Sequence, residues 1–119
     1  MVGMQNFKNL RVYEDAFSLS KELYQFFDGK KMSFRTKEQL LASASSICAN
    51  LAEMAAFESR NQMRQKVITF IGEANETEFW LNLTHETKIL PQREHLQFMN
   101  KLVKVRSMLF NLKKNMEAD

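Results

Sequence analysis

The sequence is poor in the residues that interrupt helices and in those that form disulfides. It has one proline, three glycines and one cysteine among 119 residues. Because proline and glycine mark turns, their scarcity favours long helices and argues against a fold of short strands. The single cysteine, Cys48, excludes an intramolecular disulfide and a cysteine-based metal site. Its place among apolar residues predicts a buried side chain.

Two further absences concern the location of the chain. No apolar run approaches the roughly 20 residues that a membrane-spanning helix needs, and the N-terminus carries no secretory signal. We therefore expect a cytoplasmic, reducing location and no membrane association. Hydrophobic residues make up 45% and charged residues 26% of the sequence, which is typical of a folded globular chain. The length predicts a single domain over residues 1–119.

Apolar residues recur at helical spacing in four segments. These predicted helices cover about residues 10–27, 38–57, 61–88 and 92–116. Asp28 and Gly29 predict the end of the first helix, and Pro91 predicts the end of the third. Ser33 or Thr36 is placed to cap the second. Four helices joined by short connections predict an all-α fold, namely an antiparallel up-down-up-down four-helix bundle.

The helix predicted over residues 38–57 is apolar or uncharged on two sides. One side carries the larger apolar residues, and the other carries small ones such as Ala42, Ala49 and Ala56. The helices predicted over residues 61–88 and 92–116 also carry a second apolar side. One bundle core cannot bury so much apolar surface, so we predict a symmetric, ring-like homo-oligomer that covers the remainder.

The two histidines test whether the bundle holds a catalytic metal. Di-iron bundles use paired Glu-x-x-His motifs, but Asn82 and Gln92 stand three residues before His85 and His95. Neither histidine follows an arginine at the four-to-six-residue spacing of HEPN-type ribonucleases, and no Gly-rich phosphate loop is present. We therefore predict a protein that is not an enzyme, with no catalytic residue, no cofactor and no metal.

Several polar residues lie within or beside the apolar stripes of the last two helices. Glu78, Asn82 and His85 share one side of their helix, and Arg106 and Lys113 lie in the apolar arc of the next. One interpretation is a structural network in which these groups satisfy one another. The other is a pocket with a carboxylate or histidine of shifted pKa. The first is the more economical, and the role of these residues stays open.

Positive charge gathers in two parts of a chain whose formal net charge is +3. Residues 92–116 carry six Lys or Arg against one Glu, and residues 29–66 carry seven against three. This pattern predicts binding of RNA or DNA through phosphates. The first candidates are Lys101, Lys104, Lys113 and Lys114, and the second are Lys30, Lys31, Arg35 and Lys37. The alternative is a protein-interaction scaffold or adaptor without a nucleic-acid role, and an ordinary solvated surface is also compatible.

Three blocks of the sequence resemble a known family. They are FKNLRVYEDAFSLSKELY (residues 7–24), SSICANLAE (residues 45–53) and EANETEFWLNL (residues 73–83). The family is a group of four-helix-bundle proteins first noticed as open reading frames in intervening sequences of large-subunit ribosomal RNA genes. Its central signature is carried here by Ser46, Ile47, Asn50, Ala52 and Glu53, and the third block by Glu76 and Trp80. The family signature usually continues with Gly, where this chain has Met54.

The resemblance implies a ring-like homopentamer. It also implies kinship with the accessory variability protein of diversity-generating retroelements, which binds nucleic acid and associates with a reverse transcriptase. Within the signature, Asn50 and Glu53 are three residues apart and face away from the core stripe of their helix. We expect both to hydrogen-bond across one helix contact and to fix its register.

Overall fold

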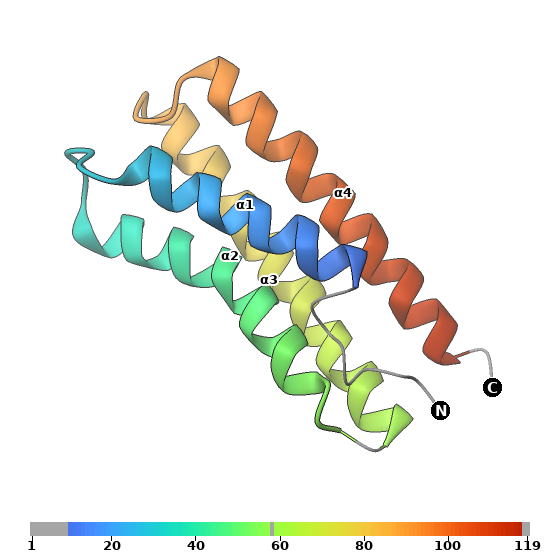
Figure 1. The fold of residues 1–119 in the computed structure, drawn as a ribbon. Helices are drawn as coiled ribbons and strands as arrows, with labels where there is room; N and C mark the ends of the chain where they lie inside the picture. The colour runs from blue at the N-terminus through green and yellow to red at the C-terminus, as the bar shows by residue number, and fades with distance from the viewer. Residues whose placement is uncertain (1–9, 58, 118–119) are drawn as a thin grey trace.

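The computed structural model describes residues 10–57 and 59–117, and these contain four α-helices and no strand. The helices are α1 (Arg11–Phe27), α2 (Phe34–Met54), α3 (Arg60–Glu86) and α4 (Gln92–Glu117). Helix α1 packs against α2 and α4, and α3 packs against the same two helices. The α1–α2 and α3–α4 connections lie at one end of the molecule, whereas the end of α2 and the start of α3 lie at the other (Figure 1). The predicted all-α class is confirmed for the described residues.

Helix α2 begins and ends earlier than its apolar pattern predicts. It begins at Phe34, because the Ser33 hydroxyl caps it by accepting a hydrogen bond from Thr36 N at 3.3 Å. It ends at Met54, after which the N–H groups of residues 55–57 each bond to a carbonyl three residues earlier, at 3.0–3.3 Å. The apolar pattern therefore continues past the helix in tighter turns.

Each of the two connections at the shared end, α1–α2 and α3–α4, contains one residue in the left-handed backbone conformation. Gly29 has φ +74° and ends α1 as the sequence predicts, because glycine adopts this conformation without a steric penalty. Lys88, with φ +65°, takes the same role after α3, and the next two backbone N–H groups both bond to Thr84 O at 2.9 Å. Pro91 then starts α4, since its carbonyl accepts a hydrogen bond from His95 N at 2.9 Å.

Each helix contributes one stripe of fully buried side chains to a single core. These include Leu19, Leu23 and Phe27 of α1, Leu40, Ile47 and Leu51 of α2, Phe70, Ala74 and Leu81 of α3, and Leu102, Val105 and Leu109 of α4. Cys48 is buried as predicted, and burial raises the pKa of its thiol to about 11. The thiol is therefore protonated at neutral pH and packs as a small apolar group. Across the described residues, no helix is long and apolar enough to span a membrane.

Candidate functional sites

Two of the four α4 lysines predicted to bind phosphate are ion-paired with α1. Lys101 Nζ pairs with Glu22 Oε2, and Lys104 Nζ lies 3.6 Å from Asp15 Oδ2. The two lysine side chains are 41% and 56% exposed, so they stay accessible to solvent. Each nevertheless has a carboxylate beside it, which offsets the positive charge that a phosphate would meet. Phosphate binding by Lys101 and Lys104 stays a prediction, and their ion pairs with α1 argue against it.

Lys113 and Lys114 do not join the other two α4 lysines in one patch. Nine residues separate Lys104 from Lys113, which corresponds to about 14 Å along the helix axis. Lys114 is exposed, whereas Lys113 is half-buried. The helix-four cations are therefore two separate pairs along α4, one beside α1 and one near the C-terminal end of the helix.

The cations of the α1–α2 connection and of the first turn of α2 divide into engaged and free ones. Lys30 Nζ lies 4.4 Å from the centre of the Phe26 ring, and Lys37 Nζ donates to Lys30 O at 3.0 Å. Lys31 and Arg35 are exposed, and the described part of the chain gives neither a hydrogen-bond or ion-pair partner. These two are the cations of the second candidate set that remain available to a ligand.

The fold adds two cations that the sequence patterns did not single out. Lys88 and Arg93 belong to the α3–α4 connection and the first turn of α4, and both are exposed. The two connections share one end of the molecule (Figure 1). We call this the basic end and define it by Lys30, Lys31, Arg35, Lys37, Lys88 and Arg93. Four acidic residues, Asp28, Glu38, Glu86 and Glu94, lie in the same segments, so the positive excess there is modest.

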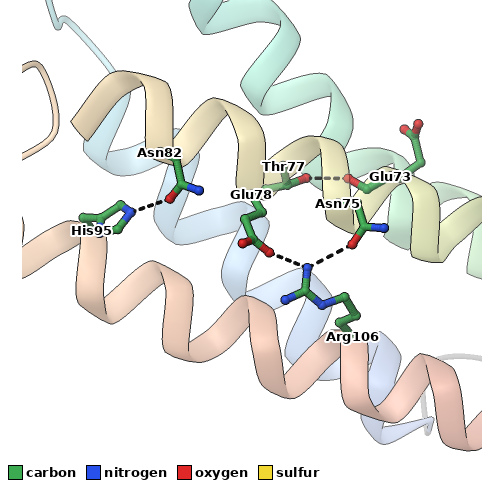
Figure 2. A network of polar contacts seen from close by, with 7 residues as sticks. All are labelled: Glu73, Asn75, Thr77, Glu78, Asn82, His95 and Arg106. Atoms are coloured by element: carbon green, nitrogen blue, oxygen red, sulfur yellow. Dashed lines mark hydrogen bonds and ion pairs between the residues drawn. The ribbon is translucent and has the colours of Figure 1, made fainter. Parts of the chain in front are cut away.

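A polar network joins α3 to α4 along their contact (Figure 2). Arg106 Nη1 donates to Glu78 Oε1 at 2.5 Å and to Asn75 Oδ1 at 3.0 Å, and the Arg106 side chain is 22% exposed. Asn82 lies one helix turn after Glu78, closer to the basic end, and its Oδ1 lies 2.9 Å from His95 Nε2. Of the groups that the sequence placed beside apolar stripes, Glu78 and Arg106 bond to each other, as the structural interpretation predicts, whereas Asn82 pairs with His95.

The histidines stack on each other at the end of this network. The ring centres of His85 and His95 are 4.3 Å apart at 14°, and His85 Nδ1 lies 3.1 Å from Leu90 O. Burial and the neighbouring His85 lower the pKa of His95, and Glu86 partly opposes them. In the described residues, no group of three or more His, Cys, Asp or Glu side chains could hold a metal ion.

Two of the signature residues of α2, Ser46 and Glu53, make polar contacts with α3. Ser46 Oγ donates to Glu73 Oε2 at 2.6 Å, and Glu53 Oε1 lies 3.4 Å from Lys66 Nζ. Asn50 Nδ2 instead donates within its own helix, to the carbonyl and hydroxyl oxygens of Ser46 at 2.8 and 3.1 Å. The prediction of a direct cross-helix bond from Asn50 is therefore wrong. Its carboxamide lies one turn from Ser46 and orients the hydroxyl that makes the cross-helix bond.

The remaining signature residues are structural in position. Ile47 is fully buried in the core, and Ala52 is half-buried. Trp80 Nε1 donates to Glu76 Oε2 at 3.1 Å, one turn apart within α3. This bond satisfies an indole N–H that is only partly exposed.

An apolar groove runs between α1 and α2. It has a volume of about 510 Å³ and is bordered by the exposed rings of Phe17 and Tyr24, with small α2 residues such as Ala49 and Ala52 at its floor. Ser20 contributes a buried hydroxyl group to the lining, beside the Cys48 thiol. The groove is the place where the small-residue side of α2, noted in the sequence, meets the aromatic side of α1.

A second apolar surface covers the outer side of α3 and α4. Its members are Ile68, Phe79 and Leu83 of α3 and Leu96, Val103 and Phe110 of α4, which are 38–59% exposed. The bonds from Asn82 to His95, Glu78 to Arg106 and Arg60 to Asn115 fix how the two helices align. In that alignment Leu83 falls at the level of Leu96, Phe79 at that of Val103, and Ile68 at that of Phe110. We call these six residues the α3/α4 ladder.

Four helices around one core, with polar contacts that bond helix to helix, define a four-helix bundle. Residues 8–111 match the family model described as 23S rRNA-intervening sequence protein, and the chain belongs to this family. A crystal structure of a protein of unknown function from the S23 ribosomal protein family of Bacteroides thetaiotaomicron is similar. The two are 26% identical with a TM-score of 0.80, over 87% of this chain and 98% of that one. No curated protein matches the chain.

Proposed function

We propose that the chain is a non-enzymatic, self-assembling helical bundle that binds nucleic-acid phosphates at its basic end. The observation that carries the nucleic-acid part is that four exposed cations of the basic end, Lys31, Arg35, Lys88 and Arg93, have no carboxylate partner among the described residues. Cations that are already paired gain less from a phosphate than free ones. The likeness to a family described by a ribosomal RNA intervening sequence supports an accessory role in an RNA-related system.

The assembly part rests on two apolar surfaces of different shape. The α3/α4 ladder carries projecting side chains, whereas the α1/α2 groove is a hollow floored by small ones. Since α1 and α2 pair on one side of the core and α3 and α4 on the other, the two surfaces lie on opposite sides of one molecule. We infer that the ladder of one copy packs into the groove of the next. A contact of this head-to-tail kind forms a closed ring when the rotation between successive copies brings the last copy back to the first.

The full architecture that we propose is an antiparallel up-down-up-down bundle in a ring-like homo-oligomer, with the pentamer of the family resemblance as the expected number. Connections at alternating ends of the molecule support the bundle topology (Figure 1). A cytoplasmic location and association with a reverse transcriptase remain predictions. The second rests on the resemblance alone.

The test compares two double variants that each remove two positive charges. Lys31→Gln with Arg35→Gln removes free cations, and Lys101→Gln with Lys104→Gln removes cations paired with α1. We expect the first variant to weaken binding of RNA and DNA and to reduce its salt dependence, and the second to have a smaller effect. Fluorescence anisotropy across a salt titration gives both quantities. A parent protein that binds neither nucleic acid at low salt would reject the proposal and leave the scaffold alternative.

A further inference from the structure

Phe34 has no packing role that explains its presence. It is the first residue of α2 and is 77% exposed, the highest exposure of any large apolar side chain in the described residues. Helix α1 ends at Phe27, so no helix lies over the outer side of this first turn. A polar residue at this position would leave the core unchanged. An exposed aromatic ring without a structural reason points to a contact outside the chain.

The surroundings of Phe34 describe what that contact would meet. Lys31 and Arg35 flank it, and both are exposed and free of partners within the described residues. The Ser33 cap fixes the start of the helix, so the ring and the Arg35 guanidinium leave adjacent positions of an ordered turn. An exposed aromatic ring with cations nearby in the sequence is a combination by which proteins hold single-stranded nucleic acid, where bases stack on rings and phosphates meet Lys or Arg.

We propose that Phe34 stacks on one base of a single-stranded nucleic acid while Lys31 and Arg35 hold the phosphates beside that base. This inference rests on the proposed function and names the substrate class of the basic end. In a duplex the bases are stacked on one another, so the Phe34 ring has no base face to meet there. The cations, in contrast, contact the backbone of either form. Stacking on the Phe34 ring therefore distinguishes a single strand from a duplex.

An anionic membrane is a weaker fit to the same residues. Membrane binding by a surface segment grows with the apolar area that it inserts. Phe34 is the only large apolar side chain that is exposed in residues 28–38, since Met32 is half-buried. One ring inserts little area, whereas it suffices to stack one base.

The experiment measures three labelled probes by fluorescence anisotropy: single-stranded RNA, single-stranded DNA of the same sequence, and their duplex counterpart, each of about 12 nucleotides. Phe34→Ala should weaken binding of at least one single strand about tenfold and leave duplex binding nearly unchanged. Phe34→Trp should restore single-strand binding and show quenching of its indole fluorescence when the strand is added. The comparison between RNA and DNA tells which strand is the ligand.

The outcomes separate this inference from the proposed function. A parent that binds no probe rejects both. A parent that binds all probes, with Phe34→Ala equal to it or weakened on duplex and single strand alike, rejects the stacking role alone. A changed oligomeric mass of Phe34→Ala would make the ring an assembly contact and would also reject it. Sedimentation with phosphatidylserine vesicles that depends on Phe34, without single-strand binding, would assign the ring to a membrane instead.

Discussion

Arg106→Leu would remove the side chain that joins two polar residues of α3 to α4 (Figure 2). Its Nη1 donates to Glu78 Oε1 at 2.5 Å and to Asn75 Oδ1 at 3.0 Å. Because the Glu78 side chain is only 34% exposed, the variant would leave a partly shielded carboxylate without its cation. A hydrogen bond to a charged group contributes about 1.5–3 kcal/mol, and the remaining solvent exposure screens part of it. We expect the free energy of unfolding to fall by about 1–2 kcal/mol.

A double-mutant cycle with Glu78→Leu isolates the pair. Removing both partners leaves no unpaired charge, so the double variant should lose about 1 kcal/mol less than the sum of the single losses. Urea unfolding followed by circular dichroism at one protein concentration gives the four free energies. Arg93→Leu is the matched control, because it deletes an exposed arginine without a partner and should change stability by less than about 0.5 kcal/mol. Additive losses, or an Arg106→Leu variant as stable as the parent, would refute the tie between α3 and α4.

Two further predictions test the assembly and the histidine pair. Val103→Asp places a charge in the middle of the α3/α4 ladder and should reduce the mass measured by light scattering. Asn111→Asp changes an exposed position of the same helix outside the ladder and should leave the mass unchanged. Equal masses for the two variants would exclude the ladder as an interface. Since the pKa of His95 is lowered in the folded state, its contribution to stability is fully present above the ordinary value of 6.5 and is lost as the pH falls below it. The midpoint of thermal unfolding should therefore drop between about pH 7 and pH 5, and less so in His95→Gln; parallel curves for parent and variant would contradict this.

The helices could be predicted from the sequence because each carries one continuous apolar stripe at helical spacing. Gly29 marks the real end of α1, because its backbone restriction acts locally, whereas Pro91 directly precedes α4 and α3 already ends at Glu86. The bounds of α2 were less predictable. Its apolar pattern runs beyond Met54, although the α-helix ends there and tighter turns follow. The end of α3 was also hard to predict, because its left-handed residue is Lys88 and lysine has no preference for that conformation.

The site was less accessible to sequence reasoning, because its electrostatics depend on contacts between distant residues. Lys101 reads as a free cation along α4, and its partner Glu22 stands 79 residues earlier. Likewise, Lys88 and Arg93 join Lys31 and Arg35 only because two connections share one end of the bundle (Figure 1). The distribution of charge along the sequence thus favoured α4 as the phosphate-binding site, whereas the positions of unpaired cations in the structure favour the basic end. Phe34 is exposed because α1 ends at Phe27 and does not cover it, and the sequence patterns did not predict this exposure.

The arrangement of the surfaces connects the two parts of the proposed function. The ladder and the groove lie on the long sides of the bundle, and the basic end with its four free cations lies at one end. If copies pack side by side around an axis along the helices, every basic end faces the same rim of the ring. The four free cations of one basic end give a salt slope of about −2.8 on a single strand if each neutralises one phosphate. A steeper slope is expected when several copies contact the same strand, because linkage within the ring raises the effective concentration of each further site. Under this arrangement, a variant that breaks the ring should bind with a shallower slope even though its own cations are intact.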